Sequence, residues 1–175
     1  MITEKIIAKL RDIPDFPKPG IIFKDITPIL KDADLCKEIT EALAAPFKDI
    51  QIDGVAGIES RGFLFGMMMA QILKVPFVPI RKAGKLPYKT ISQAYSLEYG
   101  EAVLEIHEDA FQSGSRILIH DDLLATGGTV VAASKLVQKL GASVAAYSFL
   151  IGLDFLGGES RLSKYSPEIH RLVRF

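Results

Sequence analysis

The sequence predicts an α/β protein in which a mostly parallel central sheet is flanked by helices. Two apolar runs typical of buried strands, at residues 51–58 and 117–119, are each followed by apolar residues at helical spacing, at 62–73 and 130–140. A further strand-like run occurs at 76–80. Strands that alternate with helices in this way are typical of parallel sheets covered on both faces.

The N-terminal elements follow from apolar spacing and from proline. Residues 1–12 carry isoleucine and leucine at helical spacing among charged residues, which predicts an amphipathic helix. The prolines of segment 14–28 exclude a regular helix there and predict an extended path, with a short strand at 21–23. A second helix is predicted at 33–47.

The second half of the chain continues the pattern after one irregular segment. Residues 81–100 are expected to be irregular, whereas 102–106 and 142–153 are predicted to be strands. No internal repeat or change of composition divides the chain. Its 175 residues suit one domain over 1–175, able to bury about 70% of the surface that the unfolded chain exposes.

Charge and hydropathy exclude several classes of function. Basic and acidic residues number 21 each and the pI is about 6.8, so no global field attracts nucleic acid or an anionic membrane. The longest apolar stretch, residues 144–153, is too short to span a bilayer. The amphipathic start is unlike a signal peptide, and the single cysteine, Cys36, allows no internal disulfide. A cytoplasmic protein without nucleic-acid or membrane partners is therefore expected.

The most informative stretch, residues 116–129, joins a buried strand to a helix through a loop of small residues. The loop comprises Ala125, Thr126, Gly127, Gly128 and Thr129. Free N–H groups and the positive end of the helix dipole favour a phosphate at such a position, and glycine lets the backbone approach it closely. No Lys-Ser/Thr pair follows the glycines and no Gly-x-Gly-x-x-Gly is present, so neither a Walker A loop nor a dinucleotide motif is supported.

Two acids, Asp121 and Asp122, stand just before this loop. Carboxylates beside a phosphate repel it unless they accept hydroxyl hydrogen bonds or meet a cation. The pair therefore indicates a sugar diol with Mg²⁺ nearby, and ribose 5-phosphate fits this description. The simpler alternative is a strand-to-helix turn in which aspartate caps the helix and glycine bends the chain.

Five segments together resemble the type I phosphoribosyltransferases, and among them the branch that uses adenine. They are, in chain order, 16–28 (FPKPGIIFKDITP), 59–63 (ESRGF), 81–87 (RKAGKLP), 95–100 (YSLEYG) and 121–129 (DDLLATGGT). The resemblance spans nearly the whole chain. It implies the type I phosphoribosyltransferase fold, with a small N-terminal hood at about 1–30 and a mobile flap at about 82–100.

The resemblance also implies an activity in purine salvage. Enzymes of this branch transfer the 5-phosphoribosyl group from phosphoribosyl pyrophosphate to adenine and form AMP and pyrophosphate. Mg²⁺ is expected as the cofactor, carried by phosphoribosyl pyrophosphate near the acid pair without direct protein ligands, and members are commonly homodimers. Two alternatives stay open: a hypoxanthine or xanthine phosphoribosyltransferase, and a non-catalytic regulator that senses phosphoribosyl pyrophosphate.

Residues in two segments are candidates for binding pyrophosphate. They are Ser60, Arg61, Arg81, Lys82 and Lys85. Ser60 and Arg61 follow the predicted strand 51–58, where open α/β sheets place ligands, and a guanidinium matches phosphate oxygens. The alternative for Arg61 is a surface ion pair with Glu59. The basic, acid-free start of segment 81–97 is typical either of a solvated loop or of a lid that excludes water from an activated sugar.

Glu98 is the third expected catalytic acid, with Asp121 and Asp122. Tyr95 and Leu97 alternate as on a strand, so Glu98 should project to the opposite face. The resemblance implies that it lies on the flap and approaches the reacting base and ribose. An exposed strand glutamate is the alternative.

The expected adenine contacts are Ile22, Phe23 and Lys24. The ring of Phe23 can stack on a purine, although from the residues alone a phenylalanine here is more often part of the core. The resemblance suggests that the extended backbone of Ile22 and Lys24 meets the polar edge of the base. His120 stands where the family commonly has an aliphatic residue, and we expect it to be packed or hydrogen-bonded and to point away from Asp121.

Overall fold

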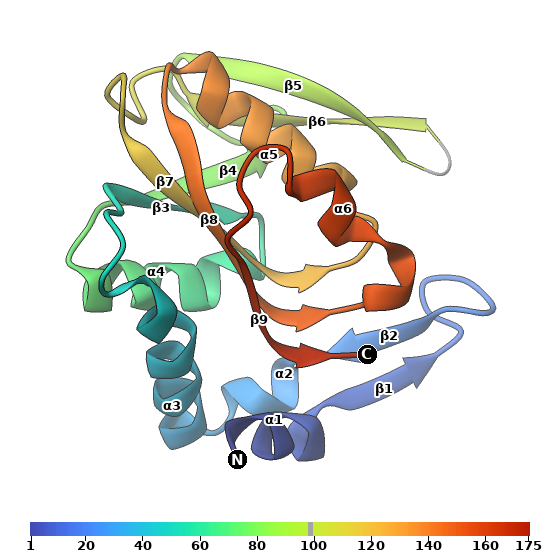
Figure 1. The fold of residues 1–175 in the computed structure, drawn as a ribbon. Helices are drawn as coiled ribbons and strands as arrows, with labels where there is room; N and C mark the ends of the chain where they lie inside the picture. Colours follow the sequence, from blue (N-terminus) through green and yellow to red (C-terminus); the bar gives the residue numbers. More distant parts are fainter. Residues whose placement is uncertain (98–99) are drawn as a thin grey trace.

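A seven-stranded sheet forms the centre of the fold over residues 1–97 and 100–175, which this computed structural model describes (Figure 1). Its strands in spatial order are β5 (Thr90–Leu97), β6 (Gly100–His107), β4 (Phe77–Lys82), β3 (Gly54–Ile58), β7 (Arg116–Leu124), β8 (Ser143–Gly152) and β9 (Ile169–Arg174). Neighbours from β4 to β9 are parallel, whereas β6 pairs antiparallel with β4 and β5. The predicted mostly parallel sheet is confirmed.

Helices cover both faces of this sheet (Figure 1). They include α3 (Ala33–Ala44) and α4 (Gly62–Leu73) on one face, and α5 (Gly128–Lys139) with the short α6 (Gly158–Leu162) on the other. Alternate residues of β7 supply the two cores: Leu118 packs with α3 and α4, while Ile117 and Ile119 pack with α5. The predicted helices at 33–47, 62–73 and 130–140 are confirmed within a few residues.

The N-terminal segment forms a separate two-stranded hairpin. After α1 (Ile2–Lys9), β1 (Arg11–Pro14) pairs antiparallel with β2 (Ile22–Asp25), so that Ile13 stands opposite Phe23. The short helices α2 (Thr27–Leu30) and η1 (Ala45–Phe47) flank α3. The strand expected at 21–23 is thus present, whereas the helix expected over 1–12 ends at Lys9 and its last predicted residues belong to β1.

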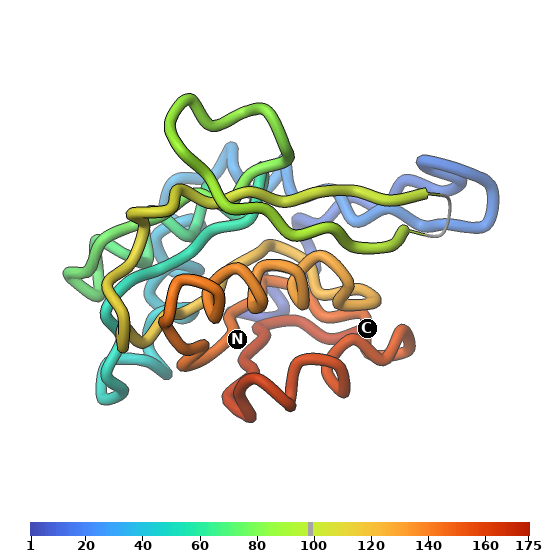
Figure 2. The backbone as a smooth tube through the Cα atoms, turned by 90° about the horizontal axis from the view of Figure 1, so that it is seen from above, coloured from blue at the N-terminus to red at the C-terminus, as the bar shows by residue number. Residues whose placement is uncertain are grey.

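The expectation that residues 81–100 are irregular is wrong over β5. This strand pairs with β6 from Thr90, opposite His107, to Leu97, opposite Gly100, and it lies along α5 (Figure 2). The alternation of Tyr95 and Leu97 is the part of its pattern that the sequence shows. One face of β5 is exposed, and the opposite face is half-buried and includes the polar Gln93, so the apolar period that marks a half-buried strand is weak there.

Three further elements have no clear sequence signal: η2 (Asp154–Leu156), α6 and β9. They follow the long buried strand β8 and return the chain to the edge of the sheet. No helix in the described part of the chain is long and apolar enough to cross a membrane.

Candidate active site

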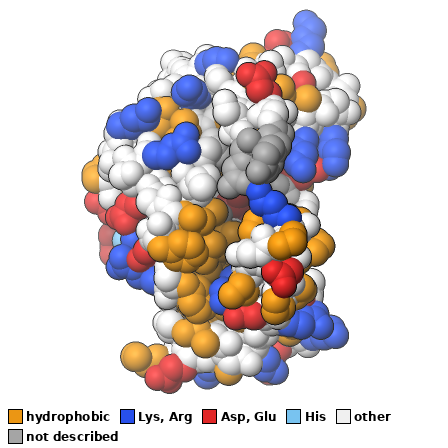
Figure 3. All heavy atoms as spheres, turned by 90° about the vertical axis from the view of Figure 1, so that its right-hand side faces the viewer, with side chains coloured by type: hydrophobic (Ala, Val, Ile, Leu, Met, Phe, Trp, Pro, Cys, Tyr) orange, Lys and Arg blue, Asp and Glu red, His pale blue; other side chains and the backbone are white. Residues whose placement is uncertain are grey.

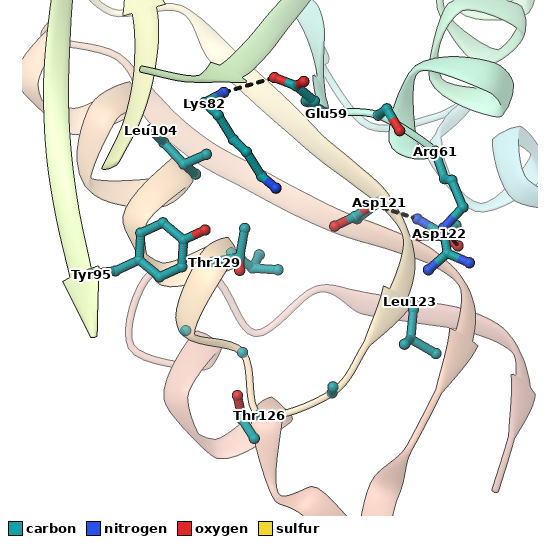
Figure 4. Close-up of a pocket in the computed structure, with 15 residues that line it drawn as sticks. Glu59, Arg61, Lys82, Tyr95, Leu104, Asp121, Asp122, Leu123, Thr126 and Thr129 are labelled. Carbon is teal, nitrogen blue, oxygen red and sulfur yellow. Dashed lines mark hydrogen bonds and ion pairs between the residues drawn. The ribbon is translucent and has the colours of Figure 1, made fainter. Parts of the chain in front are cut away.

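A cavity of about 330 Å³ opens at the carboxyl ends of β3, β4 and β7 (Figure 4). Segments that are distant in the sequence meet there. The predicted residues that line it are Ser60, Arg61, Lys82, Asp121, Asp122 and the loop residues Ala125, Thr126, Gly127, Gly128 and Thr129. Parallel strands bring their carboxyl ends to one edge of the sheet, which is why these segments converge.

The loop between β7 and α5 is built to receive an anion. Gly127 precedes α5 with a φ of +80°, a left-handed conformation that favours glycine. The free N–H groups of the first helical turn therefore lie at the cavity wall, at the positive end of the helix dipole. Behind the loop, Arg161 Nη1 donates to Thr126 O at 3.1 Å, and a Cβ on Gly158 would overlap with Ala125 O.

The two acids lie side by side at the end of β7. The N–H of Asp122 donates to Asp121 Oδ1 at 2.9 Å, and the side chain of Asp122 is only 6% exposed. Burial raises the pKa of both carboxyls; the charge of Asp122 adds to the rise at Asp121, while Arg61 opposes it at both. A cation or a hydroxyl donor in the cavity would therefore stabilise their charged forms strongly.

Arg61 joins the acid pair to the N-terminal hairpin. Its Nε lies 2.9 Å from Asp122 Oδ2, and its Nη1 donates to Lys24 O at 3.4 Å. The guanidinium carbon also lies 4.8 Å from the centre of the Phe23 ring, within the range of a cation–π contact. An ion pair of Arg61 with Glu59, the alternative from the sequence, is wrong because Glu59 faces other cations.

Glu59 gathers the basic residues at the end of β4. Its buried carboxylate, 7% exposed, accepts hydrogen bonds from Lys85 Nζ at 2.8 Å, from the Lys82 N–H at 2.8 Å and from Arg81 Nε at 3.3 Å. Burial alone would raise its pKa, but these donors outweigh burial and lower the pKa to about 2. The predicted residues Arg81 and Lys85 thus lie against Glu59 and do not themselves line the cavity, whereas the side chain of Lys82 extends into it (Figure 4).

Several lining residues were missed by sequence reasoning. They are Glu59, Tyr95, Leu104, Leu123 and Val130. Tyr95 reaches the cavity from β5 and lies beside Thr129 (Figure 4). The alternation of Tyr95 with Leu97 could have indicated which face of the strand Tyr95 lies on. Nothing in the sequence shows that β5 passes beside the loop 125–129.

A second, more apolar cavity of about 570 Å³ adjoins the first. The adenine candidates Ile22, Phe23 and Lys24 line it, and Leu123, Ala125 and Thr126 line both cavities. Its other walls include the C-terminal residues Leu153, Phe155, Leu156 and Phe175. The last four carry no sequence signal, because an apolar side chain in a pocket looks like one in the core.

The side of the molecule toward which both hairpins extend has hydrophobic side chains gathered beside a hollow (Figure 3). Phe23 is half-buried there and meets the edge of Phe16, with ring centres 5.2 Å apart. Lys24 Nζ lies 2.8 Å from Asp12 Oδ1 and 4.1 Å from the centre of the Phe175 ring. These contacts fix the hairpin beside the second cavity.

Two remaining sequence expectations have different outcomes. Glu98 lies outside the described residues, so its expected role stays a prediction. His120 is fully buried and packs toward α4 near Gly66, as expected, but neither of its ring nitrogens has a hydrogen-bond partner. Burial outweighs a small opposing effect of the Ser148 backbone and lowers the pKa of His120 to about 4.

Comparison with known proteins places this geometry in a family. The model of the phosphoribosyl transferase domain matches residues 25–168. Over all 175 residues the chain is 50% identical to an adenine phosphoribosyltransferase of Cytophaga hutchinsonii, of which it covers 97%.

Solved structures show the same similarity. The chain superposes with a TM-score of 0.95 on the adenine phosphoribosyltransferase of Thermoanaerobacter pseudethanolicus, at 51% identity and with 99% of each chain covered. The TM-score is 0.91, at 40% identity and 98% coverage of each chain, for the adenine phosphoribosyltransferase of Saccharomyces cerevisiae, which was crystallised with an imino-altritol bisphosphate and adenine.

Proposed function

The chain belongs to the adenine phosphoribosyltransferases, within the phosphoribosyl transferase domain family. We propose that its two cavities hold the two substrates of one transfer. The enzyme moves the 5-phosphoribosyl group of phosphoribosyl pyrophosphate to adenine and releases AMP and pyrophosphate. The reaction converts a free base to a nucleotide and so belongs to purine salvage.

One observation carries this assignment of the cavities. Leu123, Ala125 and Thr126 form a wall common to the polar cavity and the apolar one. A phosphorylated sugar in the polar cavity and a flat base in the apolar cavity would therefore lie next to each other, in contact with the same three residues. That proximity is what a transfer between the anomeric carbon and a ring nitrogen needs.

The sugar is held at both ends. The loop 125–129 binds the 5-phosphate through its N–H groups and the threonine hydroxyls. Asp121 and Asp122 accept hydrogen bonds from the ribose hydroxyls. Binding energy at the phosphate, remote from the reacting bond, then positions the anomeric carbon.

The acids also suit the charge that develops during the transfer. Breaking the anomeric C–O bond leaves positive charge on the ribose, as in glycoside hydrolysis. Asp121 and Asp122 lie where their charges would favour this cationic state. Glu98 accepts the proton from N9 of adenine as the new bond to the anomeric carbon forms, and no covalent enzyme intermediate is required.

Pyrophosphate leaves toward the basic side of the polar cavity. Ser60, Arg61 and Lys82 line this side, with Arg81 and Lys85 behind them on Glu59. A guanidinium can bind two phosphate oxygens at once, and a lysine adds a mobile charge. Arg61 would exchange its contact with Asp122 for one with pyrophosphate.

The donor set fits a magnesium ion that is carried by the substrate. Asp121 and Asp122 offer carboxylate oxygens at the polar cavity, and in the described part of the chain no three His, Cys, Asp or Glu side chains could hold a metal together. Mg²⁺ prefers oxygen ligands and retains water, so phosphoribosyl pyrophosphate oxygens would hold it near Asp121 and Asp122. When bound, the ion neutralises charge on the departing pyrophosphate.

Adenine occupies the apolar cavity against Phe23. Its ring stacks there, while the main chain of Ile22 and Lys24 offers N–H and C=O groups to the base edge. Stacking contributes affinity with little discrimination, so the main-chain hydrogen bonds would select the base.

The proposal includes a homodimer in the cytoplasm. Support for the dimer comes from α4, where Leu64, Met67, Met68 and Ile72 are exposed along one helix, a pattern that marks interaction surfaces. Support for the location comes from phosphoribosyl pyrophosphate, a polyanion that does not cross membranes unaided. Light scattering of the purified protein tests the dimer, because a monomer mass would contradict it.

Product analysis tests the function directly. Adenine, hypoxanthine, guanine and xanthine are each supplied with phosphoribosyl pyrophosphate, with and without Mg²⁺, and the nucleotides are separated. We expect AMP from adenine with Mg²⁺ and at least about a hundredfold lower rates with 6-oxopurines, since unpaired polar groups in a base site reject the wrong base. Binding of phosphoribosyl pyrophosphate without any nucleotide product would contradict the proposal.

A further inference from the structure

Glu59 places a negative charge in a site that is proposed to bind an anion. It is a carboxylate at the wall of a cavity that, on the proposed function, must accept the several negative charges of pyrophosphate. It is 7% exposed, and its lowered pKa keeps it charged at neutral pH. A bare negative charge there would repel the leaving group, so its contacts decide what it does.

Those contacts converge from one turn of the chain. Oε1 accepts from Lys85 Nζ at 2.8 Å, and Oε2 accepts from the Lys82 N–H at 2.8 Å. Arg81 reaches both oxygens, with Nε at 3.3 Å and Nη2 at 3.4 Å. One buried carboxylate thus holds two basic side chains and the backbone of a third basic residue.

The same network closes the turn that follows β4. Arg81 Nη1 donates to Lys85 O at 3.3 Å, so Arg81 and Lys85 hold each other as well as Glu59. Glu59 itself is fixed by its own N–H, which donates to Ile80 O at 2.9 Å and continues the parallel ladder between β3 and β4. The position of the cations is therefore set by the sheet.

Of the three basic residues that Glu59 contacts, Lys82 directs its side chain into the cavity. Because Glu59 binds the backbone of Lys82 and not its ammonium group, the Lys82 side chain extends into the cavity (Figure 4). Long basic side chains lose rotamer freedom when they bind a phosphate, and preorganisation reduces that cost at the time of binding.

We propose that Glu59 is a positioning residue, which holds Arg81, Lys82 and Lys85 in place for the pyrophosphate group of the donor substrate. The inference rests on the proposed function. Glu59 touches the cations and not the reacting atoms, and it does not border the apolar cavity. Its removal should therefore weaken the binding of phosphoribosyl pyrophosphate and leave the binding of adenine unchanged.

The test compares Glu59→Gln with the wild-type enzyme in steady-state kinetics. We expect the KM for phosphoribosyl pyrophosphate and the inhibition constant of pyrophosphate both to rise at least about tenfold. The KM for adenine should stay within about twofold, as expected for a change confined to one substrate's subsite. A merely structural role would lower the melting temperature without this division between substrates.

Two further variants keep the test decisive. Glu105→Gln removes the charge of another acid that contacts this turn, since Glu105 of β6 accepts from Gly84 N at 3.0 Å through Oε2, and it should leave all three constants unchanged. Glu59→Asp keeps the charge on a shorter side chain and should give an intermediate rise. If Glu59→Gln does not fold, Glu59→Asp carries the test, with a rise of at least about threefold expected for the donor alone.

Tighter binding of pyrophosphate by Glu59→Gln would overturn the inference, because Glu59 would then compete with the anion for the cations. Unchanged kinetic constants in both Glu59 variants would overturn it as well. So would an effect of Glu105→Gln as large as that of Glu59→Gln. The wild-type control separates the two proposals. If the wild-type enzyme forms no AMP, the proposed function fails, whereas AMP formation with unaffected Glu59 variants removes the positioning role alone.

Discussion

The guanidinium of Arg61 lies 2.9 Å from the carboxylate of Asp122 and so joins the start of α4 to the end of β7. The same side chain contacts Phe23 and Lys24 of the N-terminal hairpin. Arg61 therefore touches residues of both cavities. Replacing Arg61 should therefore change the kinetic constants for both substrates, whereas replacing Glu59 should change those for phosphoribosyl pyrophosphate alone.

Arg61→Lys should lower kcat/KM for each substrate by at least about tenfold, because an ammonium group cannot reproduce the bidentate fork or the stacking of guanidinium. Arg116→Lys is the matched control, since Arg116 stands at the opposite end of β7 and is exposed. Initial-rate measurements with each substrate varied in turn decide the matter. An effect limited to adenine would contradict a role in binding pyrophosphate.

Asp122→Asn should raise the KM for phosphoribosyl pyrophosphate by at least about tenfold. The amide loses the charge that binds a diol, and it leaves Arg61 without its buried partner. Saturation curves for both substrates measure the change. Unaltered saturation with phosphoribosyl pyrophosphate would count against the assignment of the ribose hydroxyls to the acid pair.

Glu98→Ala should lower kcat by more than about tenfold while the protein stays folded, the size expected when acid–base assistance is lost. Glu101→Ala serves as the control, because Glu101 is an exposed residue of β6 opposite Ser96. Single-turnover kinetics and circular dichroism give the rate and the fold. A wild-type rate in Glu98→Ala removes this residue from the mechanism.

Gly158→Ala should weaken the binding of ribose 5-phosphate. A Cβ at this position overlaps with Ala125 O, so the loop before α5 must move, and small displacements of a binding loop are costly. We expect a loss of affinity of about tenfold or more by calorimetry. Ser163→Ala, at the end of the same helix, should bind like the wild type; equal affinities of all three proteins would show that the loop tolerates the shift.

His120→Leu should make stability less dependent on pH. The pKa of His120 is about 4 in the folded protein and about 6.5 when unfolded, so between these values the unfolded chain binds more protons there. The contribution of neutral His120 is complete above the upper value and is lost as the pH falls toward the lower one. Relative to the variant, the wild type should lose up to about 3 kcal/mol of unfolding free energy between about pH 7 and pH 4.

Urea unfolding at a series of pH values measures this difference. A constant offset between His120→Leu and the wild type across the range would contradict the prediction.

Much of the polar cavity could be predicted because its chemistry is local in the chain. The segment from Asp121 to Thr129 carries the acids, the glycines and the helix start together, and the position of Arg61 after a strand places it at the same sheet edge. The partner of Arg61 could not be predicted in this way. Glu59 is nearer in sequence, but packing gives Glu59 to Arg81 and Lys85, and gives Asp122 to Arg61.

The apolar cavity was only half predictable. Phe23 lies within a recognisable segment, whereas Phe155 and Phe175 come from the C-terminal part of the chain and have no motif around them. Because the hydrophobic effect is non-directional, an apolar side chain does not indicate from the sequence which partner it will contact. Only the path of the chain through β9 shows that these residues meet the N-terminal hairpin. The strand β5 was not predicted, because one of its faces is exposed and its half-buried face carries the polar Gln93 between apolar residues, which weakens the apolar period.

The lining that the two cavities share at Leu123, Ala125 and Thr126 has a consequence for inhibitor chemistry. A compound that tethers a purine to a phosphorylated sugar mimic would occupy both chambers at once, and its second half would bind at the high effective concentration set by a short tether. A larger side chain in place of Leu123 would reduce the space where the two cavities adjoin, and it should weaken the binding of the tethered compound more than that of either fragment alone.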